Sequence, residues 1–102
     1  MKTDTLKTEI FDQYADKVCR KYKIDKKDLF IRSHRARLVN ARQILYYLCY
    51  TYPMKIVHIE RLMEKNGYER AQRSVINGVQ QMKIRVAEDE DYVKIIENIK
   101  KL

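Results

Sequence analysis

The stretch MKIVHIERLMEKNGYERAQRSVINGVQQMKIRV, residues 54–86, carries two apolar repeats at helical spacing on either side of a short polar turn. The apolar residues of the first repeat are Ile56, Ile59, Leu62 and Met63. Those of the second are Val75, Val79, Met82 and Val86, with Ile76 beside them. Because residues three and four apart share one face of a helix, the repeats predict helices over 54–65 and 71–86. Asn66-Gly67 is typical of a helix C-terminus, so the pair predicts a helix-turn-helix.

The same apolar spacing continues through the rest of the chain. The further predicted helices are 4–22, Lys26 to about Ile31, 38–52, and a last helix that begins in the acidic run Glu88-Asp89-Glu90-Asp91. Asp4 or Thr5 is the expected cap of the first helix, and Asp25 is that of the second. Pro53 ends the third, because proline lacks the N–H that would continue the helix.

Residues that form turns are scarce, with two glycines and one proline among 102 residues. All-β domains need many turns, so we expect an all-α protein, a single domain over 1–102 built as a small bundle of about six helices. In this domain 1–22 is an N-terminal amphipathic helix, 54–86 is the helix-turn-helix, and 33–37 is a preceding basic loop. Gly78 predicts a close contact between helices 71–86 and 38–52, since glycine within a helix costs ~1 kcal/mol relative to alanine.

The excess positive charge is concentrated in the middle of the chain. Residues 32–86 hold eleven basic and three acidic side chains, a net charge of +8 that equals the formal charge of the whole chain. Four arginines and no acid lie between Arg32 and Arg42. A uniformly positive segment repels itself unless an anion binds it, so nucleic acid is the partner that this pattern favours.

Motifs for catalysis, nucleotide binding or metal binding are missing from the sequence, which has no phosphate-binding loop and no H-E-x-x-H. Cys19 and Cys49 lack the spacing of metal ligands, and we expect two reduced, buried thiols. No apolar run approaches the ~20 residues of a membrane span, and no apolar signal-peptide segment follows Met1. We therefore expect a cytoplasmic protein that is not an enzyme and uses no cofactor, metal or membrane.

The helix predicted over 71–86 has a polar face opposite its apolar stripe. This face carries Gln72, Arg73, Ser74, Asn77, Gln80, Gln81 and Lys83. Arginine pairs with guanine, and asparagine or glutamine pairs with adenine, so Arg73 and Asn77 are expected to contact bases. Ser74 and the first amides of the helix are expected to hold a phosphate, and Arg70 and Gln72 complete the expected surface.

Two motifs of the chain resemble those of one family of DNA-binding domains. Ser33-His34-Arg35-Ala36-Arg37-Leu38-Val39-Asn40-Ala41-Arg42-Gln43-Ile44, followed by Tyr47-Leu48, is similar to the family's S-R-K-R-x-I-V-x-A-R-Q-I and Y-L. Arg73-Ser74-Val75-Ile76-Asn77-Gly78 is similar to its T-T-V-I-H-A. From about Val18 to Leu102 the chain therefore resembles the C-terminal domain of the bacterial replication initiator DnaA.

The resemblance implies an all-helical domain that binds duplex DNA at short boxes of a replication origin. It implies that Arg35 or Arg37 enters the minor groove, whose negative potential attracts arginine, and that Arg42 and Gln43 lie near a phosphate. Ala71 and Gln72 stand where the family has a base-reading Asp and His, which implies a different preferred DNA sequence. We expect a stand-alone variant that acts at the nucleoid of a bacterial or phage-infected cell.

A different class of function is left open by the same residues. The exposed polar face would then meet the carboxylates of an acidic protein, and the chain would be an interaction adaptor or inhibitor without DNA sequence specificity. Two further partners are also left open, a second copy of the chain bound through the apolar stripe of helix 4–22, and a replication protein.

Overall fold

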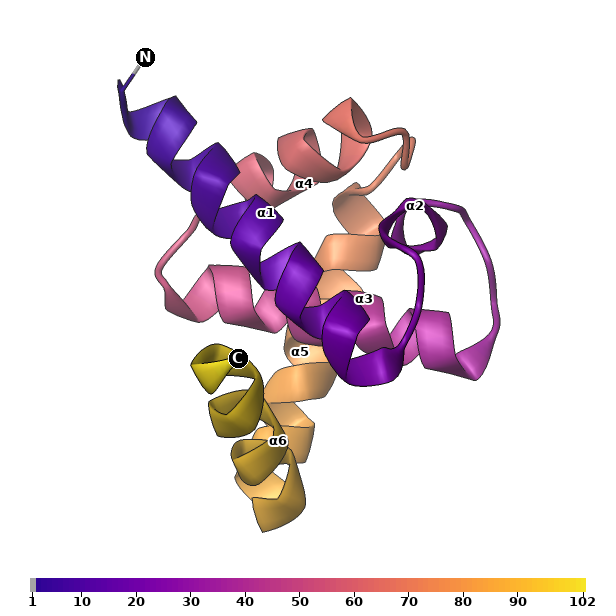
Figure 1. Cartoon of the computed structure of the whole chain (residues 1–102), viewed down its shortest axis with the longest axis vertical. Helices are drawn as coiled ribbons and strands as arrows, with labels where there is room; N and C mark the ends of the chain where they lie inside the picture. The colour runs from indigo at the N-terminus through magenta and orange to yellow at the C-terminus, as the bar shows by residue number, and fades with distance from the viewer. Residues whose placement is uncertain (1) are drawn as a thin grey trace.

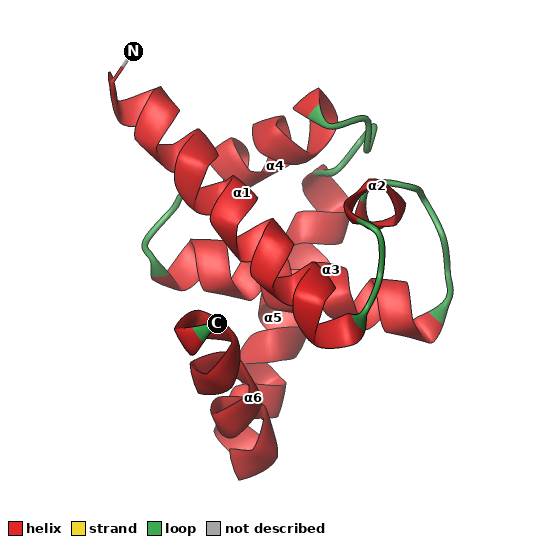
Figure 2. Ribbon diagram, in the orientation of Figure 1, coloured by secondary structure: helices red, strands yellow, loops and turns green. Residues whose placement is uncertain are grey.

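Helices form all the regular secondary structure in residues 2–102, the part of the chain that the computed structural model describes (Figures 1 and 2). The six helices are α1 (Lys2–Tyr22), α2 (Lys26–Leu29), α3 (Ala36–Thr51), α4 (Ile56–Lys65), α5 (Gln72–Glu88) and α6 (Glu90–Lys101). Side chains are described from Leu6 onward. The expected all-α class, with a bundle of about six helices, is confirmed.

Five helix ends differ by two residues from the predicted bounds, the starts of α1, α3 and α4 and the ends of α2 and α5. α1 begins at Lys2, so Asp4 and Thr5, the expected caps, lie inside the helix. α2 ends at Leu29, and α3 begins at Ala36, so Ala36 and Arg37 belong to the first turn of α3 and not to a loop. Both residues favour helix, and the backbone N–H of Arg35 donates to Ser33 Oγ just before the helix begins.

α3 is the central element of the bundle and packs against α1, α2, α4 and α5. Figure 1 shows it between α1 in front and α5 behind. Its buried apolar residues are Leu38, Ala41, Ile44, Leu45, Tyr46, Leu48 and Cys49. These residues point in several directions around the helix, since a central helix is apolar on most sides. Each large one contributes about 1.5–3 kcal/mol by leaving water.

α3 and α5 approach each other closely at Gly78, as expected from the sequence. A Cβ atom placed on Gly78 would lie 2.6 Å from Cδ2 of Tyr46. The Tyr46 side chain is 1% exposed, and its hydroxyl lies 3.0 Å from Ser74 Oγ on α5. The glycine therefore sets how near the two helices can pack and fixes the position of α5 on the core.

The turn between α4 and α5 is closed by a Schellman motif. Gly67 has a φ of +104°, its N–H donates to Glu64 O, and the N–H of Tyr68 donates to Met63 O. This is the left-handed stop that Asn66-Gly67 predicts. The turn then buries Tyr68 and passes through Arg70, which has a φ of +54°.

α6 follows α5 after a single residue, Asp89. The carboxylate of Asp89 caps α6 by accepting a hydrogen bond of 2.9 Å from the N–H of Asp91. α6 buries Ile96 and Ile99 against α5 and α1. Cys19 and Cys49 are free and buried, as expected. None of the helices in the described part of the chain has an apolar stretch long enough to cross a membrane.

Candidate nucleic-acid interface

The α2–α3 loop, residues 30–35, faces the N-terminal half of α5 across a concave surface that we call the central hollow. Arg32, Ser33 and His34 come from the loop, and Ser74 and Asn77 come from α5. Val39, Gln43 and Tyr46 of α3 line it between the two. The structure therefore brings the basic loop and the expected reading helix to one surface, although they lie some forty residues apart in the sequence.

A second concavity beside the central hollow carries three arginines. Arg32, Arg70 and Arg73 line this arginine hollow together with Glu69. Among the side chains described from Leu6 onward, the ion pairs within 4.0 Å involve Lys26 of α2, with Asp12 and Asp16 of α1. The three arginines are exposed, and no carboxylate neutralises them by direct pairing within that part of the chain. The arginine hollow is thus a concentrated positive surface.

The first two turns of α5 present the polar side chains that the sequence singles out. Gln72, Arg73 and Asn77 are exposed and line one shallow concavity with Ile76. The first amides of a helix lack partners within the helix and carry the positive end of its dipole. Gln72, Arg73 and Asn77 therefore surround a helix end that attracts anions. The opposite end of α5 is acidic, with exposed Glu88, Asp89, Glu90 and Asp91.

An aromatic ring joins the α2–α3 loop to the α4–α5 turn. Tyr68 is 6% exposed, and its ring centroid lies 4.9 Å from the guanidinium carbon of Arg32 and 5.2 Å from that of Arg42. Arg32 also donates to the backbone carbonyl of Glu69. Such cation–π contacts contribute about 0.5–2 kcal/mol each. Arg32 is therefore held in place between the two segments instead of moving freely.

Arg42 is buried at the floor of the central hollow, which it helps to line, and the expected phosphate contact stays a prediction. Its side chain is 4% exposed, and its guanidinium donates to the carbonyls of Leu29, Ile31 and Ser33 at 3.4, 3.0 and 2.5 Å. These carbonyls follow the short helix α2, where no helical partner is available. The five N–H donors of arginine satisfy them, so Arg42 shapes the α2–α3 loop from inside.

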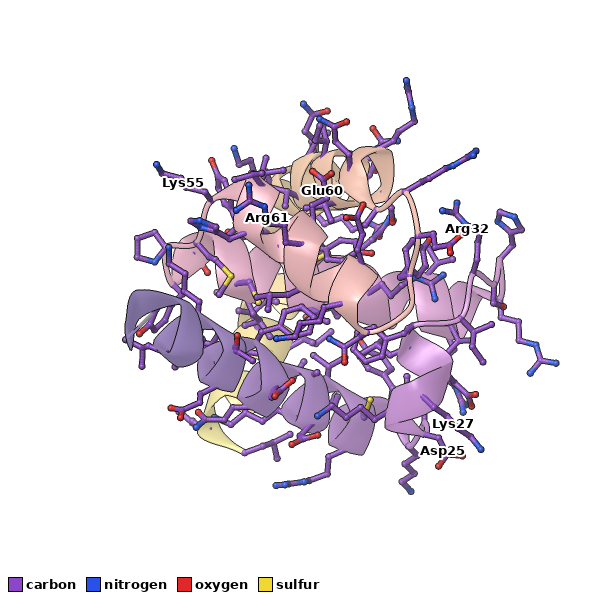
Figure 3. All side chains as sticks on the ribbon, turned by 90° about the horizontal axis from the view of Figure 1, so that it is seen from above. Asp25, Lys27, Arg32, Lys55, Glu60 and Arg61 are labelled. Atoms are coloured by element: carbon purple, nitrogen blue, oxygen red, sulfur yellow. The ribbon has the colours of Figure 1, made fainter. Side chains whose placement is uncertain are left out.

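The two arginines expected in the minor groove lie on the outer side of the loop, and Arg37 also lines a concavity that reaches Arg85 in the C-terminal half of α5. Arg35 and Arg37 line a concavity with Asp25 and Asp28 of the α1–α2 region. Figure 3 shows Arg32 well apart from the labelled Asp25 and Lys27. Both Arg35 and Arg37 are exposed. Of the arginines of the α2–α3 loop, Arg32 is the one that the structure places beside the N-terminal half of α5, and the sequence-based site does not include it.

Two other expected contacts are already partly engaged within the protein. Gln43 Oε1 accepts a hydrogen bond of 2.6 Å from Arg85, and Ser74 Oγ is bonded to the Tyr46 hydroxyl. Burial raises the pKa of Tyr46 to about 12, while the bond to Ser74 opposes that shift. The phenol is therefore neutral at physiological pH. A hydroxyl has one donor and two acceptor positions, so Ser74 keeps capacity for a further contact.

The sequence signals missed Arg32, Tyr68, His34 and Arg85. Arg32 and His34 lie in the counted basic stretch, but neither was assigned a role. Tyr68 and Arg85 depend on contacts between distant segments, and spacing along the chain does not show such contacts. No group of three or more potential metal-binding side chains occurs among the described residues, so the surface offers charge and hydrogen bonds.

Comparisons with protein-family models, curated proteins and solved structures find no match to this chain. The similarity of its motifs to the DnaA domain stays a prediction.

Proposed function

We propose that this protein binds double-stranded DNA, with α5 in the major groove and the α2–α3 loop at the adjacent minor groove. The observation that carries the proposal is the convergence of Arg32, Arg70 and Arg73 with the exposed polar face of α5, with no carboxylate from Leu6 onward paired to any of them. A major groove about 12 Å wide admits one α-helix. The positive end of α5 would then face the phosphates.

The side chains of α5 divide into two roles by position. Arg73 and Asn77 lie one turn apart on the exposed face and would contact base edges, with Gln72 beside them. Arg70 and Arg32 lie at the margin of this face and would contact phosphates. Gly78 and the Tyr46–Ser74 hydrogen bond hold α5 against α3, which would keep the reading face at a fixed angle to the groove.

Arg35 and Arg37 would supply the minor-groove contact from the outer side of the loop. Both are exposed, and Arg37 lies in the first turn of α3 while Arg35 immediately precedes the helix. A duplex lying along α5 would bring its neighbouring minor groove to this part of the molecule. The function would place the protein at the nucleoid in the cytoplasm, and the changed residues Ala71 and Gln72 would give it its own preferred site.

The decisive experiment is binding to a pool of random duplexes, followed by sequencing of the bound fraction. We expect a log–log salt dependence with a slope of roughly −4 to −6, because each neutralised phosphate contributes about one unit. Arg73→Ala should broaden the selected sequences and cost about 1–3 kcal/mol on the preferred site. Lys55→Ala is the matched control, since Lys55 is exposed and lies at the opposite end of Figure 3 from Arg32.

A salt slope near zero, or no binding to any duplex at low salt, would refute the proposal. Equal losses for Arg73→Ala and Lys55→Ala on all sequences would refute the assignment of α5 as the reading helix. An acidic protein partner would be the better explanation of the arginine hollow if the protein failed to bind DNA.

A further inference from the structure

We infer that Arg85, in the C-terminal half of α5, contacts a phosphate of the DNA, in a groove that carries one strand between α3 and α5. The inference rests on the proposed DNA binding and extends it to a residue that neither the motifs nor the polar face of α5 singles out. Its basis is another concavity, distinct from the arginine hollow, which we call the flank groove.

The flank groove adjoins the central hollow. It has a volume of about 560 Å³ and is lined by Tyr22, His34, Ala36, Arg37, Val39, Asn40, Gln43 and Arg85. His34, Val39 and Gln43 also line the central hollow. Since a water molecule occupies about 30 Å³ of liquid, the groove has ample room for a phosphodiester group. One concave path therefore leads from Asn77 on α5, across α3, to Arg85.

In the proposed binding mode, the geometry of a DNA duplex requires one sugar–phosphate strand to follow this path. A minor groove and its neighbouring major groove are separated by one sugar–phosphate strand. If the α2–α3 loop lies at the first and α5 lies in the second, that strand must pass between them. The surface between them consists of His34, Val39 and Gln43, so the strand that crosses it continues into the flank groove.

Arg85 has the chemistry and the placement to hold a phosphate there. Its Nη1 donates to Gln43 Oε1 at 2.6 Å and contacts Met82 Sδ at 3.9 Å, which leaves the N–H groups of Nη2 and Nε for another acceptor. Its guanidinium carbon lies 5.7 Å from the ring centroid of Tyr92. Among the side chains described, no carboxylate lies within 4.0 Å of it. Arg85 is thus fixed in position and uncompensated in charge.

The remaining polar groups of the groove are consistent with an anionic strand. Arg37 adds a second positive charge, and none of the described residues that line the groove is acidic. Asn40 Nδ2 donates to the Tyr22 hydroxyl at 3.1 Å, which orients its amide at the edge of the groove. Phosphate oxygens accept hydrogen bonds from arginine in a paired geometry, so Arg85 and Arg37 together would hold adjacent phosphates.

The test measures the salt dependence of binding for Arg85→Gln and Arg85→Lys, using a fluorescent duplex that the wild-type protein binds. We expect Arg85→Gln to make the log–log salt slope shallower, reducing its magnitude by about 0.9, the value for one lost phosphate contact on duplex DNA. The affinity should fall by a similar factor on every sequence, and the selected bases should not change. Arg85→Lys should restore the slope because it keeps the charge.

Lys94→Gln is the matched control, because Lys94 is an exposed basic residue of α6 outside the groove. Thermal unfolding followed by circular dichroism shows whether each variant is folded at the assay temperature. If Arg85→Gln is unfolded, Arg85→Met tests the same contact. An unchanged slope in folded Arg85→Gln or Arg85→Met, with wild-type binding intact, would overturn the inference and leave the proposed function standing. Failure of the wild-type protein to bind any duplex would overturn both.

Discussion

Replacing Gly78 by alanine tests whether the contact between α3 and α5 is as close as the structure indicates. Alanine gains about 1 kcal/mol over glycine in a helix interior. The new Cβ would lie 2.6 Å from Tyr46 Cδ2 and 3.3 Å from Gln43 Cγ. The Tyr46 ring is buried on all sides and cannot move away easily. The added methyl group therefore overpacks the core, which costs about 1–3 kcal/mol. Subtracting the helix gain from the packing cost, we expect Gly78→Ala to lower the free energy of unfolding by up to about 2 kcal/mol net.

Urea unfolding followed by circular dichroism at 222 nm provides the measurement. Gln80 is the control position, since it is exposed on the same helix two residues away. Gln80→Ala should be more stable than Gln80→Gly by about 1 kcal/mol, the intrinsic preference of a helix for alanine. At position 78 we expect the opposite order, with glycine more stable than alanine. If alanine stabilised both positions by a similar amount, the close packing of Tyr46 on Gly78 would be refuted.

Four further outcomes follow from the packing and the buried groups. Arg42→Lys should lower the free energy of unfolding by about 1–3 kcal/mol in urea titrations, because an ammonium cannot reach the three carbonyls that the guanidinium satisfies. Asp89→Ala should cost about 0.5–2 kcal/mol in the same assay, and Asp89→Asn should retain most of the cap. Burial raises the pKa of Tyr46 to about 12 from an ordinary 10.0, so the phenol ionises at lower pH in the unfolded chain than in the folded one. The free energy of unfolding should therefore fall as the pH rises from 10 to 12, and it should fall less in Tyr46→Phe. Burial also raises the pKa of the Cys19 thiol to about 11, and a thiol reagent at pH 8 should modify the native protein much more slowly than the urea-unfolded chain.

Periodicity of apolar residues was sufficient to predict the helices, because a bundle needs one buried stripe on each of them. The two glycines are also informative. Gly67 predicts a helix end because it adopts a positive φ, and Gly78 predicts a close helix contact because it has no Cβ. Boundaries were less accurate. Ala36 and Arg37 looked like loop residues because they stand in a polar stretch, yet both favour helix once Ser33 receives the N–H of Arg35.

The site was harder to predict because charge along a chain does not show where each guanidinium points. Arg42 and Arg32 belong to the same basic stretch, but one is buried under the α2–α3 loop and the other is exposed against Tyr68. Arg85 meets Gln43 across 42 residues of sequence. Contacts of this kind arise only when α3 and α5 pack together. The sequence therefore predicts that the candidate surface is positively charged, but not where each charged side chain lies on it.

The uneven charge along α5 has a consequence for how the molecule approaches a charged polymer. Arg70 and Arg73 stand at one end and the run from Glu88 to Asp91 at the other, roughly 25 Å apart at 1.5 Å per residue. In the field of a polyanion this separation produces a torque, which rotates the arginine end inward and the acidic end outward before contact. Most collisions would then begin in one orientation, and the reverse placement of the helix would be disfavoured by repulsion during the approach.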